Sequence, residues 1–137
     1  MPGERLISRA LEAPVKYLIL IYHNPQARQI WETFSDEERE SGLQVYAALN
    51  EELAASGELI VTEALADATE ARTIAVRDGQ TISRDGPFAE VKEQLAGFYL
   101  VECASIARAS EIAARIPEAG MGLIEVRPIL RYSGLEM

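Results

Sequence analysis

The stretch ARTIAVRDGQTISRDGPF, residues 71–88, decides how the rest of the chain can be arranged. Ile74 and Val76 alternate with polar or small residues, which is the period of two expected of a β-strand. An Asp-Gly pair follows, and because glycine adopts a positive φ without steric cost, this pair predicts a tight turn. The sequence therefore predicts a β-hairpin in which residues 72–77 pair with residues 80–84, with Ile74 and Val76 facing inward.

Upstream of this hairpin the sequence predicts a strand, a helix and a second strand. Residues 15–23, VKYLILIYH, are apolar almost throughout, as is typical of a central strand buried on both faces. A short helical piece follows NPQA, and then SDEE at 35–38 has the pattern of a capping box. The helix that it opens ends at Gly57, and ELIVTEAL, residues 58–65, is the next strand.

Downstream of the hairpin the sequence again predicts a strand, a helix and a strand. GFYLVEC, residues 97–103, predicts a strand, and Ser105 can cap a helix that Pro117 stops. The last strand is GLIEVRPIL, residues 122–130, in which Pro128 lacks the amide that a central strand needs. We therefore expect this strand to lie at an edge of the sheet or to end at Pro128.

The order of elements is β-α-β, a hairpin, and β-α-β, which is the split βαβ pattern of an α+β ferredoxin-like fold with an inserted hairpin. Two helices would cover only one face of such a sheet. A large apolar face that is left open normally packs against a partner. We therefore expect a homodimer formed through the sheet face.

Length and charge limit the classes of protein that the chain can belong to. The 137 residues fit one domain, which we place at residues 15–132, with an extension at 1–14 containing a short helix and a tail at 133–137. With 22 acidic against 13 basic residues the net charge is −9, which disfavours a nucleic-acid partner and weakens attraction to anionic lipid. No stretch is long and apolar enough to predict a membrane span or a signal peptide.

Cofactor and metal chemistry have little support in the sequence. The single Cys103 allows no intramolecular disulfide, which suits a cytoplasmic setting, and is expected to lie in the core. One histidine and one cysteine give no metal-ligand spacing. No glycine-rich nucleotide-binding loop is present, so we predict no cofactor and no metal.

Three stretches carry a resemblance to a known family. DGPFAEVKEQLAGFYLVE at 85–102, KYLILIYH at 16–23 and AARIPEAGMGLIEVRPIL at 113–130 resemble the DGPF branch of the YCII-related proteins. The resemblance covers residues 15–132 and implies a dimeric α+β barrel, in which two ferredoxin-like sheets pack face to face.

The resemblance implies little about function. A His-Asp active site has been proposed for some YCII-like proteins, and the wider superfamily includes muconolactone isomerase-like enzymes and small monooxygenases. Some DGPF relatives are encoded beside, or fused to, extracytoplasmic-function sigma factors, which implies a regulatory setting. The histidine of the YCII-like relatives belongs to the start of the first helix, where SDEERESGLQ at 35–44 has none. Their His-Asp pair is therefore not transferred to this chain.

His23 is the only histidine and the first candidate for acid–base chemistry, because its ordinary pKa lies near neutrality. Asp85 could orient it if the turn folds back over the end of the first strand. The alternative is a strand-end histidine satisfied by solvent, with Asp85 accepting a local amide hydrogen bond in its turn.

Further residues are candidates for ligand binding. Phe88 either anchors its turn to the core or lines a cleft with Tyr22, Trp31 and Tyr99. A single cation beside an apolar pocket can hold a carboxylate, and this predicts Lys92 or Arg84 as the partner of a small organic acid.

Two functions remain open. One is a homodimer that binds a small organic ligand between sheet and helices, in the regulatory setting that the resemblance implies. The other is a cofactor-independent isomerase, lyase or oxygenase that uses His23 or Asp85 for proton transfer.

Overall fold

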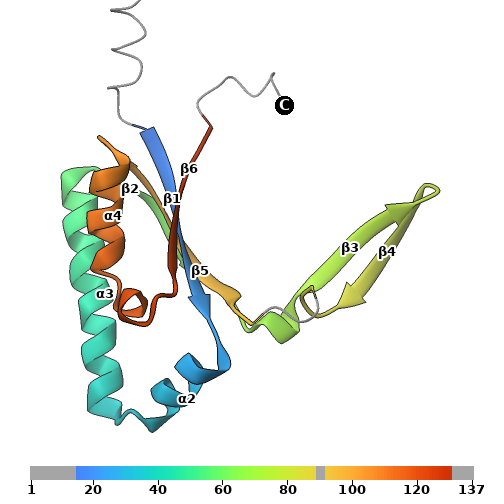
Figure 1. Cartoon of the computed structure of the whole chain (residues 1–137), viewed down its shortest axis with the longest axis horizontal. Coiled ribbons are helices and arrows are strands. Elements are labelled where there is room, and N and C mark those ends of the chain that lie inside the picture. The colour runs from blue at the N-terminus through green and yellow to red at the C-terminus, as the bar shows by residue number, and fades with distance from the viewer. Residues whose placement is uncertain (1–14, 89–91, 131–137) are drawn as a thin grey trace, which may run out of the picture.

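The computed structural model describes residues 15–88 and 92–130, which form an α+β fold (Figure 1). The short helix predicted within residues 1–14 and the tail at 133–137 lie outside the described residues. The elements in chain order are β1 (Val15–His23), α2 (Pro25–Thr33), α3 (Asp36–Ser56), β2 (Leu59–Ala64), η1 (Ala68–Glu70), β3 (Arg72–Arg77), β4 (Gln80–Asp85), β5 (Gln94–Cys103), α4 (Ile106–Ala114), η2 (Pro117–Met121) and β6 (Ile124–Pro128).

Four strands form the main sheet in the order β2-β5-β1-β6, with antiparallel neighbours. This order is that of a ferredoxin-like fold, with β3 and β4 inserted between its second and third strands. Helices α3 and α4 lie side by side on one face of the sheet (Figure 1). The α+β class predicted from the sequence is confirmed, and β6 lies at an edge, as Pro128 predicts. No helix within residues 15–88 and 92–130 is apolar enough over a sufficient length to cross a membrane.

The core lies between the sheet and the two helices. Ile19 and Val101 from the central strands are completely buried, and so are Leu53 of α3 and Ile112 of α4. Alternation along a strand sends every second side chain to this face. The same alternation sends the intervening side chains to the opposite face.

The opposite face of the sheet carries apolar side chains that the helices leave uncovered. Two cross-strand pairs lie there, Leu18 with Leu100 and Leu20 with Phe98. Val61 on β2 pairs with Leu100 and extends the same apolar strip. We call these five residues the open face. Leu20 is nearly buried by its neighbours, whereas Val61 is 36% exposed.

The hairpin of β3 and β4 has the predicted pairing, from Arg72 with Asp85 to Arg77 with Gln80. Both turn residues have positive φ, 50° at Asp78 and 76° at Gly79, as in a type I′ turn.

One expectation about this hairpin is wrong. Ile74 and Val76 were expected to face inward, but they are 60% and 67% exposed. The reason is that the hairpin forms a separate two-stranded sheet and projects away from the helices (Figure 1). Alternation along a strand defines two faces, but it does not show whether either face is covered.

Local capping signals explain where the helices begin. The capping box of α3 is present: Glu38 N donates to Ser35 Oγ at 3.1 Å, and Ser35 N donates to a Glu38 carboxylate oxygen at 2.9 Å. The short helix α2 begins earlier than predicted, at Pro25, because Asn24 accepts a hydrogen bond from Ala27 N at 2.7 Å. An Asn cap followed by Pro at the first helical position is the signal for this start.

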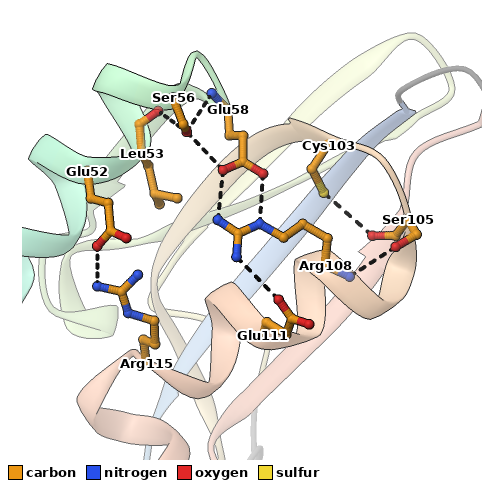
Figure 2. A network of polar contacts seen from close by, with 9 residues as sticks. All are labelled: Glu52, Leu53, Ser56, Glu58, Cys103, Ser105, Arg108, Glu111 and Arg115. Carbon is orange, nitrogen blue, oxygen red and sulfur yellow. Dashed lines mark hydrogen bonds and ion pairs between the residues drawn. The ribbon is translucent and has the colours of Figure 1, made fainter.

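A polar network joins the end of α3 to α4 (Figure 2). The Arg108 guanidinium donates to both carboxylate oxygens of Glu58, at 2.8 and 2.9 Å. These hydrogen bonds are the largest cause of a pKa of Glu58 that is lowered to about 2. A second ion pair joins Arg115 to Glu52 on α3 (Figure 2). The network fixes α4 beside α3 at the edge of the core.

Candidate ligand-binding cleft

A cleft of about 600 Å³ opens between the sheet and helices α2 and α3. Sites for small molecules commonly have this size and combine apolar walls with a few polar groups. Its lining consists of Ile21, His23, Arg28, Trp31, Leu43, Tyr46, Asn50, Thr62, Glu63, Ala64, Ala96, Gly97, Tyr99 and Glu118.

Small residues on the strands leave the space that the cleft occupies. Ala64 at the end of β2 pairs with Gly97 on β5, and both line the cleft. A Cβ atom at Gly97 would lie 2.9 Å from the carbonyl oxygen of Glu63, so no side chain fits there without a backbone shift. The close approach of β2 to β5 therefore requires glycine, and the missing side chain widens the cleft.

One polar contact of the cleft joins helix α3 to η2. The Tyr46 hydroxyl donates to the Glu118 carboxylate, at 2.6 Å from one of its oxygens. Burial raises the pKa of Tyr46 well above its ordinary value, and the hydrogen bond and charge of Glu118 raise it further. Tyr46 therefore stays protonated and holds the Glu118 carboxylate in the cleft.

A second tyrosine, Tyr99 of β5, is fixed in a similar way by Asn50, which lies one turn beyond Tyr46 on α3. Tyr99, which is 1% exposed, donates a hydrogen bond from its hydroxyl to the Asn50 side-chain oxygen. Burial raises the pKa of Tyr99, so it also remains protonated. The contact leaves the Asn50 amide nitrogen available to donate to a ligand, since the oxygen is already used.

Helix α2 closes one end of the cleft with Arg28 and Trp31. The Arg28 guanidinium pairs with the Asp67 carboxylate, so its charge is already compensated. The pKa of Asp67 is lowered to about 2, mainly by the Thr69 backbone amide, which donates at 2.9 Å. The Arg39 guanidinium lies 5.5 Å from the centre of the Trp31 ring and steadies it.

His23 and Tyr22 are neighbours in sequence but lie at different sites. His23 lines the cleft and is exposed at its edge. The Tyr22 hydroxyl donates a hydrogen bond to the Glu125 carboxylate at 2.8 Å. The Tyr22 side chain lines a separate hollow of about 480 Å³ at the base of the hairpin. Successive side chains of a strand point to opposite faces of the sheet, so Tyr22 lies on the opposite face from both His23 and Tyr99.

Arg84, Asp85 and Phe88, which were predicted as site residues, do not line the cleft that His23 lines. Asp85 ends β4, where its carboxylate is 3.9 Å from the Arg72 guanidinium and 89% exposed. No hydrogen bond or ion pair between Asp85 and His23 is present in the described part of the chain, so their pairing stays a prediction. Phe88 and Arg84 line a hollow of about 250 Å³ on the hairpin.

Three further predicted residues have definite positions. Phe88 is 78% exposed and so does not anchor its turn to the core. Lys92 is exposed and lines neither the cleft nor the hollows described above. Cys103 is buried, and burial raises the pKa of its thiol, which disfavours the nucleophilic thiolate. In the residues that the structure describes, no three His, Cys, Asp or Glu side chains gather in a way that could hold a metal ion.

The sequence predicted His23, Trp31 and Tyr99 as site residues but missed most of the polar lining. Tyr46 and Asn50 carry a recognisable signal, because polar side chains four residues apart share one face of a helix. Glu118 carries none, since it meets Tyr46 across 72 residues of sequence.

The fold and the cleft define a small α+β protein of the ferredoxin-like class, with a cleft between sheet and helices that is lined by apolar side chains and a few polar groups. The sequence matches the YCII-related domain family over residues 15–133, and the chain belongs to this family. It is also 37% identical over 123 residues to an uncharacterized protein of Rhizobium meliloti (strain 1021), an alignment that covers 88% of this chain and 97% of the relative.

Proposed function

We propose that this protein binds a small organic ligand in the cleft between its sheet and helices α2 and α3. The observation that carries the proposal is the convergence of fixed polar groups from two elements, α3 and η2, on one space of about 600 Å³. Tyr46, Asn50 and Glu118 supply these groups, while Trp31 and Leu43 supply apolar surface. This combination of apolar walls with a few oriented polar groups is typical of small-molecule sites.

The proposal includes a homodimer formed through the open face, as in a dimeric α+β barrel. Leu18, Phe98 and Leu100 support it, because they form an apolar strip that the helices do not cover. The single cysteine supports a cytoplasmic protein, and the resemblance to DGPF relatives supports a regulatory, sigma-factor-associated setting. Light scattering tests the dimer and is described with the open face below.

A thermal-shift screen with small amines, carboxylic acids and neutral aromatic compounds tests the ligand proposal. A compound that binds only the native state at 100 times its Kd adds about 2.7 kcal/mol to the free energy of unfolding. Ala64→Phe should abolish the shift, because the ring can lie over Gly97 and fill the cleft.

The matched control is Ala107→Phe, which places the same ring on an exposed position of α4. It should keep the full thermal shift. The proposal fails if no compound of the three classes stabilises the wild type, or if Ala64→Phe is stabilised as much as Ala107→Phe.

A second candidate function is a cofactor-independent enzyme, which is favoured by the position of His23 at the edge of the cleft. The two functions differ in what they need from this side chain. His23→Gln should abolish turnover of a bound compound if His23 transfers a proton, whereas a binding protein keeps its affinity and shows no turnover to lose.

A further inference from the structure

The ionisable side chains that line the cleft leave an excess of negative charge. Arg28 and the Glu118 carboxylate line it, together with His23. Glu63 contributes only its backbone, because it pairs with Phe98 and its side chain therefore points to the open face. The Arg28 charge is compensated by Asp67, which approaches it from η1. Within residues 15–88 and 92–130, Glu118 forms no ion pair. The cleft therefore presents negative charge that the described part of the chain does not balance.

Glu118 is the carboxylate that is best placed to receive a ligand. It is half-buried, and the Tyr46 hydroxyl fixes its orientation at 2.6 Å. A carboxylate has about four acceptor positions, so the bond from Tyr46 leaves acceptor capacity for another donor. A charged group in partly buried surroundings gains more from a counterion than an exposed one does, because the effective dielectric constant is lower.

The rest of the cleft is suited to an apolar body rather than to a second charge. The apolar wall of the cleft consists of Trp31 and Leu43 from the helices and Ile21 from β1. Ala64 and Ala96 have short side chains, which leave room for a ligand on the side of the strands. The neutral Asn50 amide is the other fixed polar group beside Tyr99. An anionic ligand would meet the like charge of Glu118 here, and such juxtaposition is unfavourable.

We propose that the cleft takes a small organic cation, an amine with an apolar body, whose ammonium group pairs with the Glu118 carboxylate while its body lies against Trp31 and Leu43. This inference rests on the proposed ligand-binding function and differs from the organic acid expected from the sequence. That expectation relied on Lys92 and Arg84, and neither of them lines the cleft.

Three probes of equal size test the charge class by calorimetric titration: 3-phenylpropylamine, 3-phenylpropionate and neutral 3-phenylpropanol. We expect the amine to bind at least about 10-fold more tightly than the alcohol, a ratio that corresponds to one well-placed charge pair. The acid should bind more weakly than the alcohol. Added sodium chloride should weaken the binding of the amine but not that of the alcohol, since salt screens charge pairs.

Glu118→Gln tests the proposed anchor. Glutamine keeps an oxygen that can accept the Tyr46 hydrogen bond but removes the charge. Amine affinity should fall about 10-fold or more, whereas the matched variant Glu51→Gln, at an exposed position of α3 outside the cleft, should leave it unchanged. If Glu118→Gln does not fold, the salt dependence of wild-type binding still tests whether the ammonium group forms a charge pair in the cleft.

The outcomes separate this inference from the proposed function. If the acid binds as tightly as the amine, or if folded Glu118→Gln keeps amine affinity within twofold, the cation inference is wrong and the cleft remains a ligand site. If none of the three probes binds, the cation inference also fails. The broader screen with Ala64→Phe then decides whether the cleft binds any ligand.

Discussion

Both faces of the four-stranded sheet carry apolar side chains, but only one face is covered within the chain. The uncovered side also carries Glu63, Glu125 and Arg127, which pair with Phe98, Leu20 and Leu18. On the helix-covered face Ile19, Val101 and Leu53 are completely buried. On the open face the Leu18–Leu100 pair is only half-buried, and Val61 is 36% exposed. The covered face is a core that also encloses a cleft, whereas the open face has the properties of a contact surface. Substitutions of similar chemistry should therefore have different effects on the two faces.

The largest effect on stability is expected at the covered face. Leu53→Ala removes a completely buried side chain from the core and should lower the free energy of unfolding by about 2–5 kcal/mol. Leu18→Ala, the same change at a half-buried position on the open face, should have less than half that effect when the chain is monomeric. Chemical denaturation at low protein concentration measures both. Equal losses would contradict the distinction between the faces.

A smaller effect is expected where Arg108 joins α4 to Glu58. Glu58→Gln should lower the free energy of unfolding by about 1–2 kcal/mol at neutral pH, because a partly exposed ion pair is screened by solvent. The pKa of Glu58 is lowered from 4.5 to about 2, so this contribution is complete above pH 4.5 and is lost as the pH falls through 2. Urea denaturation of wild type and variant at several pH values checks this.

The curves of wild type and Glu58→Gln should accordingly converge in acid. The matched control is Glu111→Gln, which removes the more exposed carboxylate partner of Arg108 (Figure 2). Its effect should stay within about 0.5 kcal/mol. A constant difference between wild type and Glu58→Gln down to the lowest pH would show that the ion pair is not the source of the stability.

The smallest effect on unfolding, but a large one on assembly, is expected at the open face. Leu100→Lys places a charge beside Leu18 and should destabilise a dimer formed through this face, because an unpaired charge is costly to bury. Light scattering should give about twice 15.1 kDa for the wild type and 15.1 kDa for the variant.

The matched control for the open face is Ser110→Lys, which adds the same charge at an exposed position on α4. It should remain dimeric. A wild type that is monomeric at micromolar concentration, or a Leu100→Lys variant that keeps the dimer mass, would remove the open face as the interface.

The two faces also show how far the sequence could predict the structure. Alternation and capping are local signals, so the strands, the Ser35 capping box and the edge position of β6 followed from short stretches. The direction of the hairpin did not, because Ile74 and Val76 have the same alternation whether or not another element covers them. For any apolar face, the sequence pattern alone does not show whether another part of the chain covers it.

The cleft was predicted only in part for a related reason. His23 and Tyr99 could be proposed because one is the only histidine and the other lies on an aromatic strand. The contact of Tyr46 with Glu118 depends on how α3 and η2 pack on the sheet, and residues 72 apart carry no local signal of it. The adjacent small residues, Ala96 and Gly97, show their role only when β2 is placed beside them.

The central claim, that the cleft is the ligand site, has a direct optical test. Trp31 is the only tryptophan in the chain and lies in the cleft wall, so its fluorescence responds to changes in that space. Each compound that stabilises the protein in the screen should change the Trp31 emission in a saturable way, with the midpoint found by calorimetry. Stabilisation and heat of binding with unchanged Trp31 emission would place the ligand elsewhere and contradict the account.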